Sequence, residues 1–321
     1  FRSMATTDHA KHLFCAWLLS LPFDVPHKPP LVLTGIWGSG KTTLATAVAR
    51  LYGMTSRTIA VGDNERSEAD FWVGCDAGGL VTMDNADSRI RWLADAVATA
   101  STGGCVERRK LYTDRELVRL RARAWIIITS ANPLFGADGG LADRVLVISL
   151  DRRIEQTAES ALFDQIDEAR EGALSFIAEA AQRALADTKP VPEGLNRRHP
   201  DWGALAVRLG RAIGTESWVI EALRRAEIDK AAFVIENHPI FRALKDVVER
   251  DHQIRGSADA LLQAMIEVDP SLERKVSATA LGRHLLKHWS FLETMFIAEK
   301  TFDLHRRATS YYFARRAEDM R

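Results

Sequence analysis

The chain has no net charge, few cysteines and no long apolar run, and each absence excludes a class of protein. Basic and acidic residues both number 43 among 321, so no overall field attracts nucleic acid or a membrane, and any polyanion site must be local. Cys15, Cys75 and Cys105 are too few and too scattered for a disulfide framework or a Cys-x-x-Cys zinc site. No stretch approaches the roughly 18 apolar residues of a membrane span, and no secretion signal is recognisable. We therefore expect a soluble cytoplasmic protein with no membrane contact.

Strand-like and helix-like segments alternate only in the first half of the chain. Short β-branched apolar runs, typical of strands buried on both faces of a parallel sheet, lie at residues 31–34, 58–61, 80–83, 125–129 and 145–150. Helices are predicted at residues 9–19, 41–52, 88–98 and 114–121. Further on, helical periodicity predicts helices at residues 154–186, 201–213, 216–227, 230–250, 257–268 and 277–288, and β-leaning stretches follow at residues 291–298 and 310–313.

This order predicts an α/β fold with a parallel-sheet phosphate-loop core, an all-helical lid and a C-terminal winged-helix domain. The expected boundaries are residues 1–29 for an N-terminal helix and linker, 30–151 for the core, 152–250 for the lid and 251–321 for the winged helix. Residues 1–3, which precede Met4, are expected to be a cloning remnant.

The strongest motif is Gly-x-x-x-x-Gly-Lys-Thr at residues 35–42, between a predicted strand and a predicted helix. Glycines let backbone amides curl around phosphates, the lysine adds a compact positive charge, and the threonine hydroxyl suits Mg²⁺. The motif predicts that the chain binds ATP with Mg²⁺. The residues expected at the nucleotide are Gly35, Gly38, Ser39, Gly40, Lys41, Thr42 and, as the next helical residue, Thr43.

A second acidic group is expected at the end of the strand over residues 80–83. Asp84 is placed there to bind Mg²⁺ together with Thr42, and a helix cap is the alternative interpretation. Asn85 stands where many ATPases carry the glutamate that activates water, and an amide can orient water but cannot take its proton. Asp87 is a candidate for the missing carboxylate, although capping the following helix is the favoured role.

The strand over residues 125–129 runs into Ser-Ala-Asn-Pro. Because the carboxyl ends of parallel strands line a ligand crevice, Thr129, Ser130 and Asn132 are candidates to reach the γ-phosphate or its attacking water, and a plain Asn-Pro turn is the alternative. Together the motifs resemble the AAA+ ATPases, above all the minichromosome maintenance helicases and the helicase-like replication ATPases of phages and mobile elements that are related to superfamily 3.

That resemblance implies a role for further residues. Asn132 would be the sensor 1 residue, and Arg144, just before the apolar strand at residues 145–150, would be an arginine finger given to a neighbouring subunit. A surface pair between Asp143 and Arg144 is the alternative. The implied catalytic set is Lys41, Asp84, Asn85, Asn132 and Arg144, acting in a homo-oligomer that we expect to be a hexamer. A sensor 2 arginine should come from the lid, where Arg198, Arg208 and Arg211 are equally eligible.

Two basic segments are candidates for DNA contact. The first lies where the families named above insert a hairpin that faces a central channel, and its candidates are Arg108, Arg109, Lys110 and Tyr112. The second is the predicted winged helix, with Arg283 and Lys287 on one helix face and Arg306 and Arg307 in the wing. A solvated basic turn and a protein-binding winged helix are the alternatives.

Three functions therefore fit the sequence. The leading one is a replicative helicase motor that couples ATP hydrolysis to movement on DNA. The second is a helicase loader or replication initiator that uses ATP as an assembly switch, which Asn85 favours. The third is an ATP-gated signalling or defence scaffold with a protein-binding winged helix.

Overall fold

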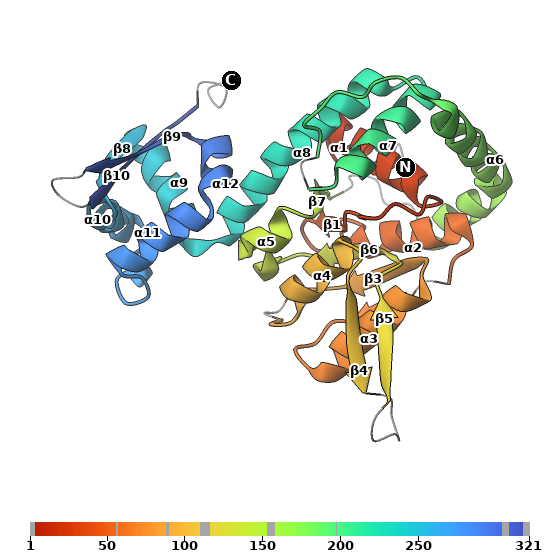
Figure 1. The fold of residues 1–321 in the computed structure, drawn as a ribbon, viewed down its shortest axis with the longest axis horizontal. Helices are drawn as coiled ribbons and strands as arrows, with labels where there is room; N and C mark the ends of the chain where they lie inside the picture. Colours follow the sequence, from red (N-terminus) through yellow and green to blue (C-terminus); the bar gives the residue numbers. More distant parts are fainter. Residues whose placement is uncertain are drawn as a thin grey trace. The chain divides into compact units, whose positions relative to one another are not determined.

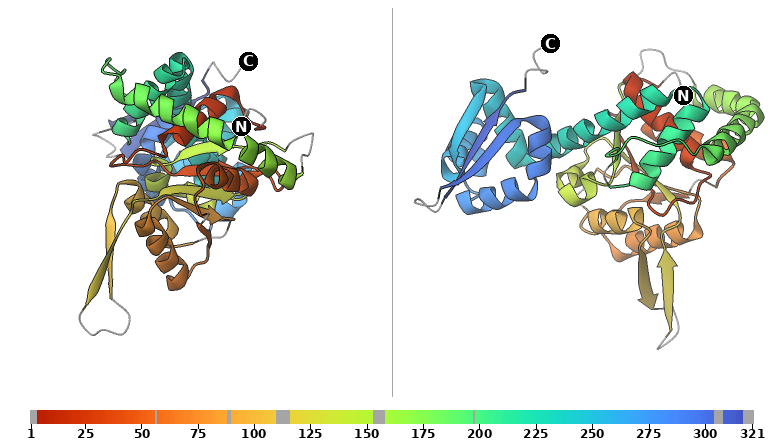
Figure 2. Two further views of the ribbon diagram at one scale, coloured as in Figure 1. Left: turned by 90° about the vertical axis from the view of Figure 1, so that its right-hand side faces the viewer. Right: turned by 45° about the horizontal axis from the view of Figure 1, so that its top comes forward.

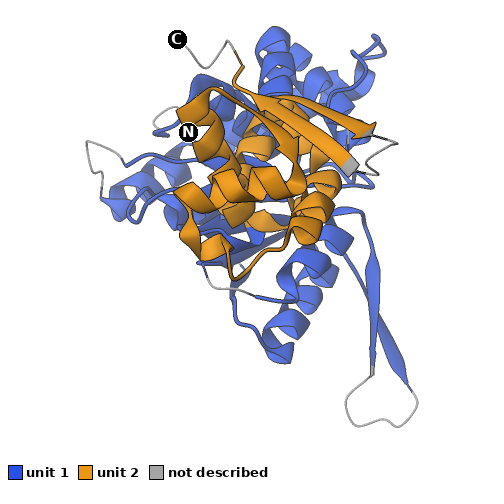
Figure 3. Ribbon diagram, turned by 90° about the vertical axis from the view of Figure 1, so that its left-hand side faces the viewer, with its two compact units in different colours: residues 1–135, 143–226 blue, residues 136–142, 227–321 orange. Residues whose placement is uncertain are grey.

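The structure is a computed structural model that describes residues 4–55, 57–87, 90–109, 116–152, 158–196, 198–303 and 308–316. The side chains of residues 109, 303 and 308 lie outside this description. The chain divides into two compact units (Figure 3): residues 1–135 with 143–226, and residues 136–142 with 227–321. None of the helices in the described part of the chain is long and apolar enough to cross a membrane.

The first unit is built on a five-stranded parallel sheet (Figure 1) with the strand order β2-β3-β6-β1-β7. The strands are β1 (Leu31–Thr34), β2 (Arg57–Ala60), β3 (Leu80–Asp84), β6 (Trp125–Ser130) and β7 (Leu146–Ser149). Every residue of the central strand β6 is buried, which explains why its sequence is a continuous apolar run rather than an alternation. The predicted parallel α/β core is confirmed.

Helices surround this sheet and share its apolar core. Those of the first unit are α1 (Asp8–Ser20), α2 (Lys41–Tyr52), α3 (Glu65–Ala77), α4 (Leu93–Ser101), α6 (Glu159–Ala186), α7 (Pro200–Ala212) and the beginning of α8 (Glu216–Asn237). Trp17 of α1 packs edge-on against Trp125 of β6, with ring centroids 5.7 Å apart. Trp202 of α7 donates its indole N–H to Ser20 at 3.1 Å. The N-terminal helix therefore joins the sheet to the helical layer.

A two-stranded hairpin projects from the first unit (Figure 2). It pairs β4 (Cys105–Arg109) antiparallel with β5 (Leu117–Arg121). The helix predicted over residues 114–121 is therefore wrong in its described part. Leucine and arginine are good helix formers, and only pairing with a strand that lies about a dozen residues away overrides that preference.

Helix α3 was not predicted, because its first turns are polar. The side chain of Asn64 accepts a hydrogen bond from the amide of Ser67 and so caps the helix. Phe71, Trp72 and Cys75 then bury its apolar side. The helix break predicted at residues 228–229 is also wrong. Helix α8 continues to Asn237, and the break comes at Pro239, which fits the first position of α9 (Pro239–Asp251).

The second unit combines helices with a small antiparallel sheet of order β8-β10-β9. Besides α9 it contains α5 (Gly139–Ala142), β8 (Gln253–Ser257), α10 (Ala258–Val268), α11 (Ala278–Lys287), α12 (Trp289–Met295), β9 (Ile297–Asp303) and β10 (Ala308–Ala314). The β-stretch predicted over residues 291–298 is mostly wrong, because residues 291–295 are helical. Trp289 at the start of α12 packs against Tyr311 and Phe313 of β10, which favours the helix.

Candidate nucleotide-binding site

The predicted phosphate loop connects β1 to α2 in the first unit. Gly35, Gly38 and Gly40 have φ angles of 141°, 78° and 85°, conformations that residues with a side chain rarely adopt. A Cβ atom on Gly35 would lie 2.1 Å from the carbonyl oxygen of Leu150, just after β7. Around Gly38 a Cβ atom would meet nothing within 4 Å. The first glycine is therefore required for close packing, and the second only for its backbone conformation.

This difference predicts two outcomes for the same substitution. Gly38→Ala should cost about 1–2 kcal/mol, the strain of a left-handed alanine, and leave ATP binding measurable. Gly35→Ala adds a backbone collision and should abolish ATP binding measured by isothermal titration calorimetry. Equal affinities of the two variants would show that the loop does not need its close approach to Leu150.

Lys41 begins α2 and is buried, with 6% of its surface exposed. Its ammonium donates to the carbonyl oxygens of Gly35 at 2.8 Å and Ile36 at 2.9 Å, and to the hydroxyl of Ser39 at 3.4 Å. Burial lowers the pKa of Lys41, and the charges of Asp87 and Asp84 act in the opposite direction. The lysine charge is therefore held within the loop.

Asp84 is the last residue of β3 and accepts hydrogen bonds from the first turn of α2 and from β6. Its Oδ1 atom accepts from the hydroxyl of Thr42 at 2.8 Å and from that of Thr129 at 2.7 Å. The structure thus brings together the two residues predicted to hold Mg²⁺. Carboxylate and hydroxyl oxygens are ligands that Mg²⁺ takes, so the residues present fit the ion.

Asn85 follows Asp84 with a positive φ of 54° and is exposed. Its side-chain amide donates to Oδ2 of Asp84 at 3.1 Å, and its backbone amide donates to the Thr129 hydroxyl at 3.0 Å. Position 85, which the resemblance to AAA+ ATPases assigns to a water-activating glutamate, thus holds an amide that donates to the neighbouring carboxylate. This geometry gives Asn85 no means of accepting a proton.

Asp87 does not cap the following helix, because the described part of that helix begins at Leu93 with Trp92 at its N-cap. Instead, Oδ1 of Asp87 accepts from the hydroxyl of Ser130 at 2.7 Å and from the amides of Ala131 at 2.6 Å and Asn132 at 3.0 Å. The turn that carries Asn132 is therefore attached to the segment after β3. Asn132 itself is exposed.

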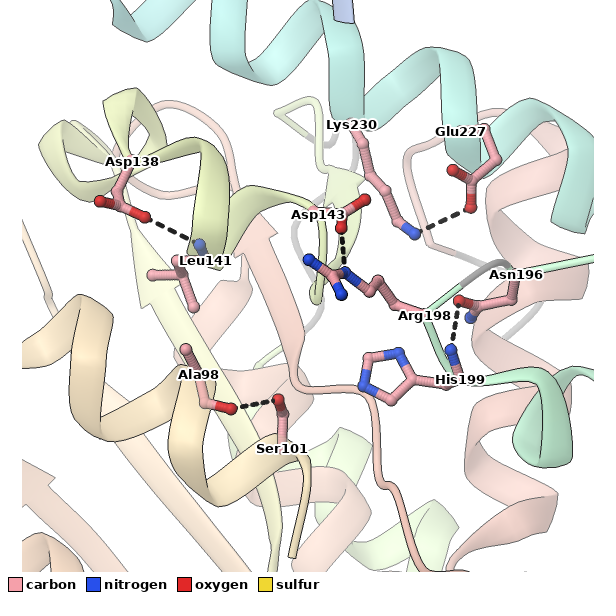
Figure 4. Close-up of polar contacts among 10 residues, drawn as sticks. All are labelled: Ala98, Ser101, Asp138, Leu141, Asp143, Asn196, Arg198, His199, Glu227 and Lys230. Atoms are coloured by element: carbon pink, nitrogen blue, oxygen red, sulfur yellow. Dashed lines mark hydrogen bonds and ion pairs between the residues drawn. The ribbon is translucent and has the colours of Figure 1, made fainter. Parts of the chain in front are cut away.

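The segment before β7 carries Asp143 and the half-buried Arg144. Asp143 is ion-paired with Arg198, which precedes α7 (Figure 4). Of the other sensor 2 candidates, Arg211 binds Asp187 at 3.1 Å and Glu216 at 2.6 Å. These contacts tie α7 to the neighbouring helical segments, which favours a structural role for Arg211.

The candidate DNA contacts lie in different surroundings. Arg108 is ion-paired with Glu68 of α3 at 3.0 Å, whereas Arg283 and Lys287 are both exposed on α11. The side chain of Arg109 and the whole of Lys110, Tyr112, Arg306 and Arg307 lie outside the described residues. The sequence did not point to Arg119 and Arg121 of β5, both exposed, although Arg-Leu-Arg at residues 119–121 alternates charged and apolar side chains as a strand does.

Comparisons with known proteins give one clear match. The model of the family described as "Actinomycete integrative conjugative element replication protein" matches residues 2–231. No curated protein shows a significant match to the chain.

Distant similarity to solved structures is illustrated by three of them. SCCmec type IV Cch, described as an active helicase, is 13% identical with a TM-score of 0.42, and the match covers 96% of this chain and 66% of that one. JCV helicase is 14% identical with a TM-score of 0.34, over 68% of this chain and 64% of that one. The C-terminal region of NrS-1 is 12% identical with a TM-score of 0.42, over 97% of this chain and 76% of that one. The chain thus spans slightly less than two thirds of the first two proteins, and likeness at this level carries no argument about function.

The family match covers well over half of the chain and includes the phosphate loop, Asp84, Asn132 and Arg144. The chain therefore belongs to the family of replication proteins of actinomycete integrative conjugative elements.

Proposed function

We propose that the chain is an AAA+ ATPase of DNA replication, a helicase motor that binds ATP and Mg²⁺ at its phosphate loop. One observation carries this proposal: Thr42 in the first turn of α2 and Thr129 of β6 both donate to the same oxygen of Asp84, the last residue of β3. The ends of β3 and β6 and the start of α2 thus converge beside the buried Lys41. Phosphoryl transfer depends mainly on such placement of positive charge and metal ligands.

Each residue of the site has a separate proposed role in hydrolysis. The loop amides and Lys41 bind the phosphates, and Thr42 and Asp84 hold Mg²⁺, which neutralises charge on the phosphate oxygens when bound. The amides of Asn85 and Asn132 orient the attacking water. Because neither amide takes a proton, hydrolysis depends on the orientation of the water rather than on proton abstraction. We therefore expect ATP turnover to be slow without DNA.

Arg144 is the proposed arginine finger. In the AAA+ ATPases that the chain resembles, such a residue reaches the nucleotide of a neighbouring subunit, so the proposed active form is a homo-oligomer, by analogy with related motors a hexamer.

The second unit supports a winged-helix domain. From α9 onwards its helices and strands follow in the order α9, β8, α10, α11, α12, β9, β10, and its sheet has the order β8-β10-β9. In this arrangement α11 is the recognition helix, capped at its N-terminus by the Ser277 side chain. Arg283 and Lys287 lie one turn apart on its exposed side, where they suit DNA phosphates.

The hairpin has two faces, and one of them is engaged with α3. Arg108 points to α3, where it pairs with Glu68, and its cross-strand partner is Val118. Because side chains alternate along a strand, Arg119 and Arg121 lie on the opposite face from Val118. We therefore assign single-stranded DNA binding by the hairpin to Arg119 and Arg121 and withdraw Arg108 from the DNA contacts.

Replacing Arg119 or Arg121 with alanine should weaken binding to single-stranded DNA severalfold. Each replacement should lower the dependence of log Kd on log salt concentration by about one unit, because one phosphate contact is lost. Fluorescence anisotropy over a salt series measures both quantities. Arg66→Ala is the matched control, because Arg66 is an exposed cation of α3 in the same unit. Unchanged slopes in both hairpin variants would rule out this DNA face.

The motor and the loader are distinguished by strand displacement. On a forked duplex with ATP and Mg²⁺, a motor unwinds DNA and the Lys41→Ala variant does not. ATP-dependent DNA binding without unwinding would favour the loader, the second candidate, which the amide at position 85 supports. If no nucleic acid tested binds to the protein, the ATP-gated signalling or defence scaffold remains as the candidate function.

A further inference from the structure

We propose that Asp87 is the positioning residue of this ATP site: its carboxylate fixes the turn that carries Asn132, and it does not replace the missing glutamate as a proton acceptor. The inference rests on the proposed ATPase function and specifies how the site works without an acid at position 85.

The contacts of Asp87 are concentrated on one oxygen. Oδ1 accepts from Ser130, Ala131 and Asn132, three consecutive residues at the end of β6, at 2.6–3.0 Å. Two of these donors are backbone amides, so the carboxylate sets the path of the chain as well as a side chain. Ser130 is fully buried, which leaves little freedom at the start of the turn.

Asp87 is itself held in place by the sheet. The amide of Ala86 donates to the carbonyl of Thr129 in β6 at 2.9 Å, so the segment after β3 stays paired with β6 beyond the end of β3. In the strand order β6 lies between β3 and β1, which places its end between Asp84 and the phosphate loop. The Asn132 turn is therefore central in the site, and Asp87 is its anchor.

The charge of Asp87 supports positioning and argues against proton transfer. Burial alone would raise its pKa, but hydrogen bonds from Asn132, Ser130 and Ala131 and the charge of Lys41 hold the pKa below its ordinary value. A general base works best when its pKa is near the working pH.

A double-mutant cycle separates the two roles. The single variants Asp87→Ala and Asn132→Ala should each lower kcat for ATP by about a hundredfold, the usual effect of losing one oriented polar group, with KM little changed. If Asp87 acts through Asn132, the fall in kcat of the double variant is no larger than that of the less active single variant. Asp87→Asn, whose oxygen can still accept from the turn amides, should recover part of the activity. If instead the losses in kcat of the two single variants multiply in the double variant and Asp87→Asn is inactive, Asp87 acts as a base and the proposal is overturned.

Hydrogen exchange provides a readout that does not depend on catalysis. In nucleotide-free protein, Asp87→Ala should speed exchange at the amides of Ala131 and Asn132. Asp76→Ala is the matched control, because Asp76 also accepts a backbone amide, that of Arg121 at 2.9 Å, elsewhere in the same unit. Unchanged protection in Asp87→Ala would overturn the proposal whatever the ATPase activity. Wild-type protein without ATPase activity but with the expected exchange pattern would instead overturn the proposed function and leave Asp87 as the anchor of the turn.

Discussion

Replacing Lys41 with alanine is expected to abolish ATP turnover, with a fall in kcat of about a thousandfold or more. The ammonium is buried inside the loop and held by Gly35, Ile36 and Ser39, so the alanine variant loses the positive charge that the loop holds in place. A phosphate release assay at saturating ATP measures the loss.

Two further variants complete that experiment. Lys41→Arg should be nearly as inactive, because the larger guanidinium does not fit a site where the lysine is only 6% exposed. Lys11→Ala is the control, since Lys11 makes only a local pair with the exposed Asp8. Turnover by Lys41→Ala at the wild-type rate would mean that hydrolysis takes place elsewhere on the chain.

Arg144→Ala is expected to lower turnover by about a thousandfold to a hundred-thousandfold, the range for loss of an arginine finger. Nucleotide affinity should stay at the wild-type value, because a finger stabilises charge that develops only in the transition state and acts on the neighbouring subunit. Titration with a fluorescent ATP analogue and a turnover assay separate the two effects. Arg183→Ala, which removes an exposed cation of α6 in the same unit, is the control.

Mixing the two inactive variants tests the subunit arrangement. In a mixed oligomer, an Arg144→Ala subunit with an intact phosphate loop can receive Arg144 from a Lys41→Ala neighbour, so activity should reappear. A mixture that stays inactive although mixed oligomers form, or normal turnover by Arg144→Ala alone, would show that Arg144 is not a finger in trans.

Local chemistry explains what the sequence predicted well. The phosphate loop needs glycines, a lysine and a threonine within eight consecutive residues, and buried parallel strands need continuous apolar runs. The positions of Lys41, Thr42 and Asp84 therefore followed from the chain itself. Their roles in nucleotide and metal binding remain predictions.

Long-range pairing explains what the sequence did not predict. The partners of Asp87 lie 43–45 residues away, so its contacts appear only once β3 and β6 are neighbours. The hairpin face with Arg119 and Arg121 likewise requires the pairing of β4 with β5. In the second unit, residues 291–295 include the good helix formers Leu292, Glu293 and Met295, and the packing of Trp289 against rings of β10 adds long-range support for the helix α12.

The most direct test of this account is ATP hydrolysis with and without single-stranded DNA, on protein whose oligomeric state has been measured. The account predicts Mg²⁺-dependent hydrolysis by an oligomer, faster with DNA and absent in Lys41→Ala. Wild-type protein that hydrolyses ATP no faster than Lys41→Ala, with DNA present and the oligomer formed, would contradict it.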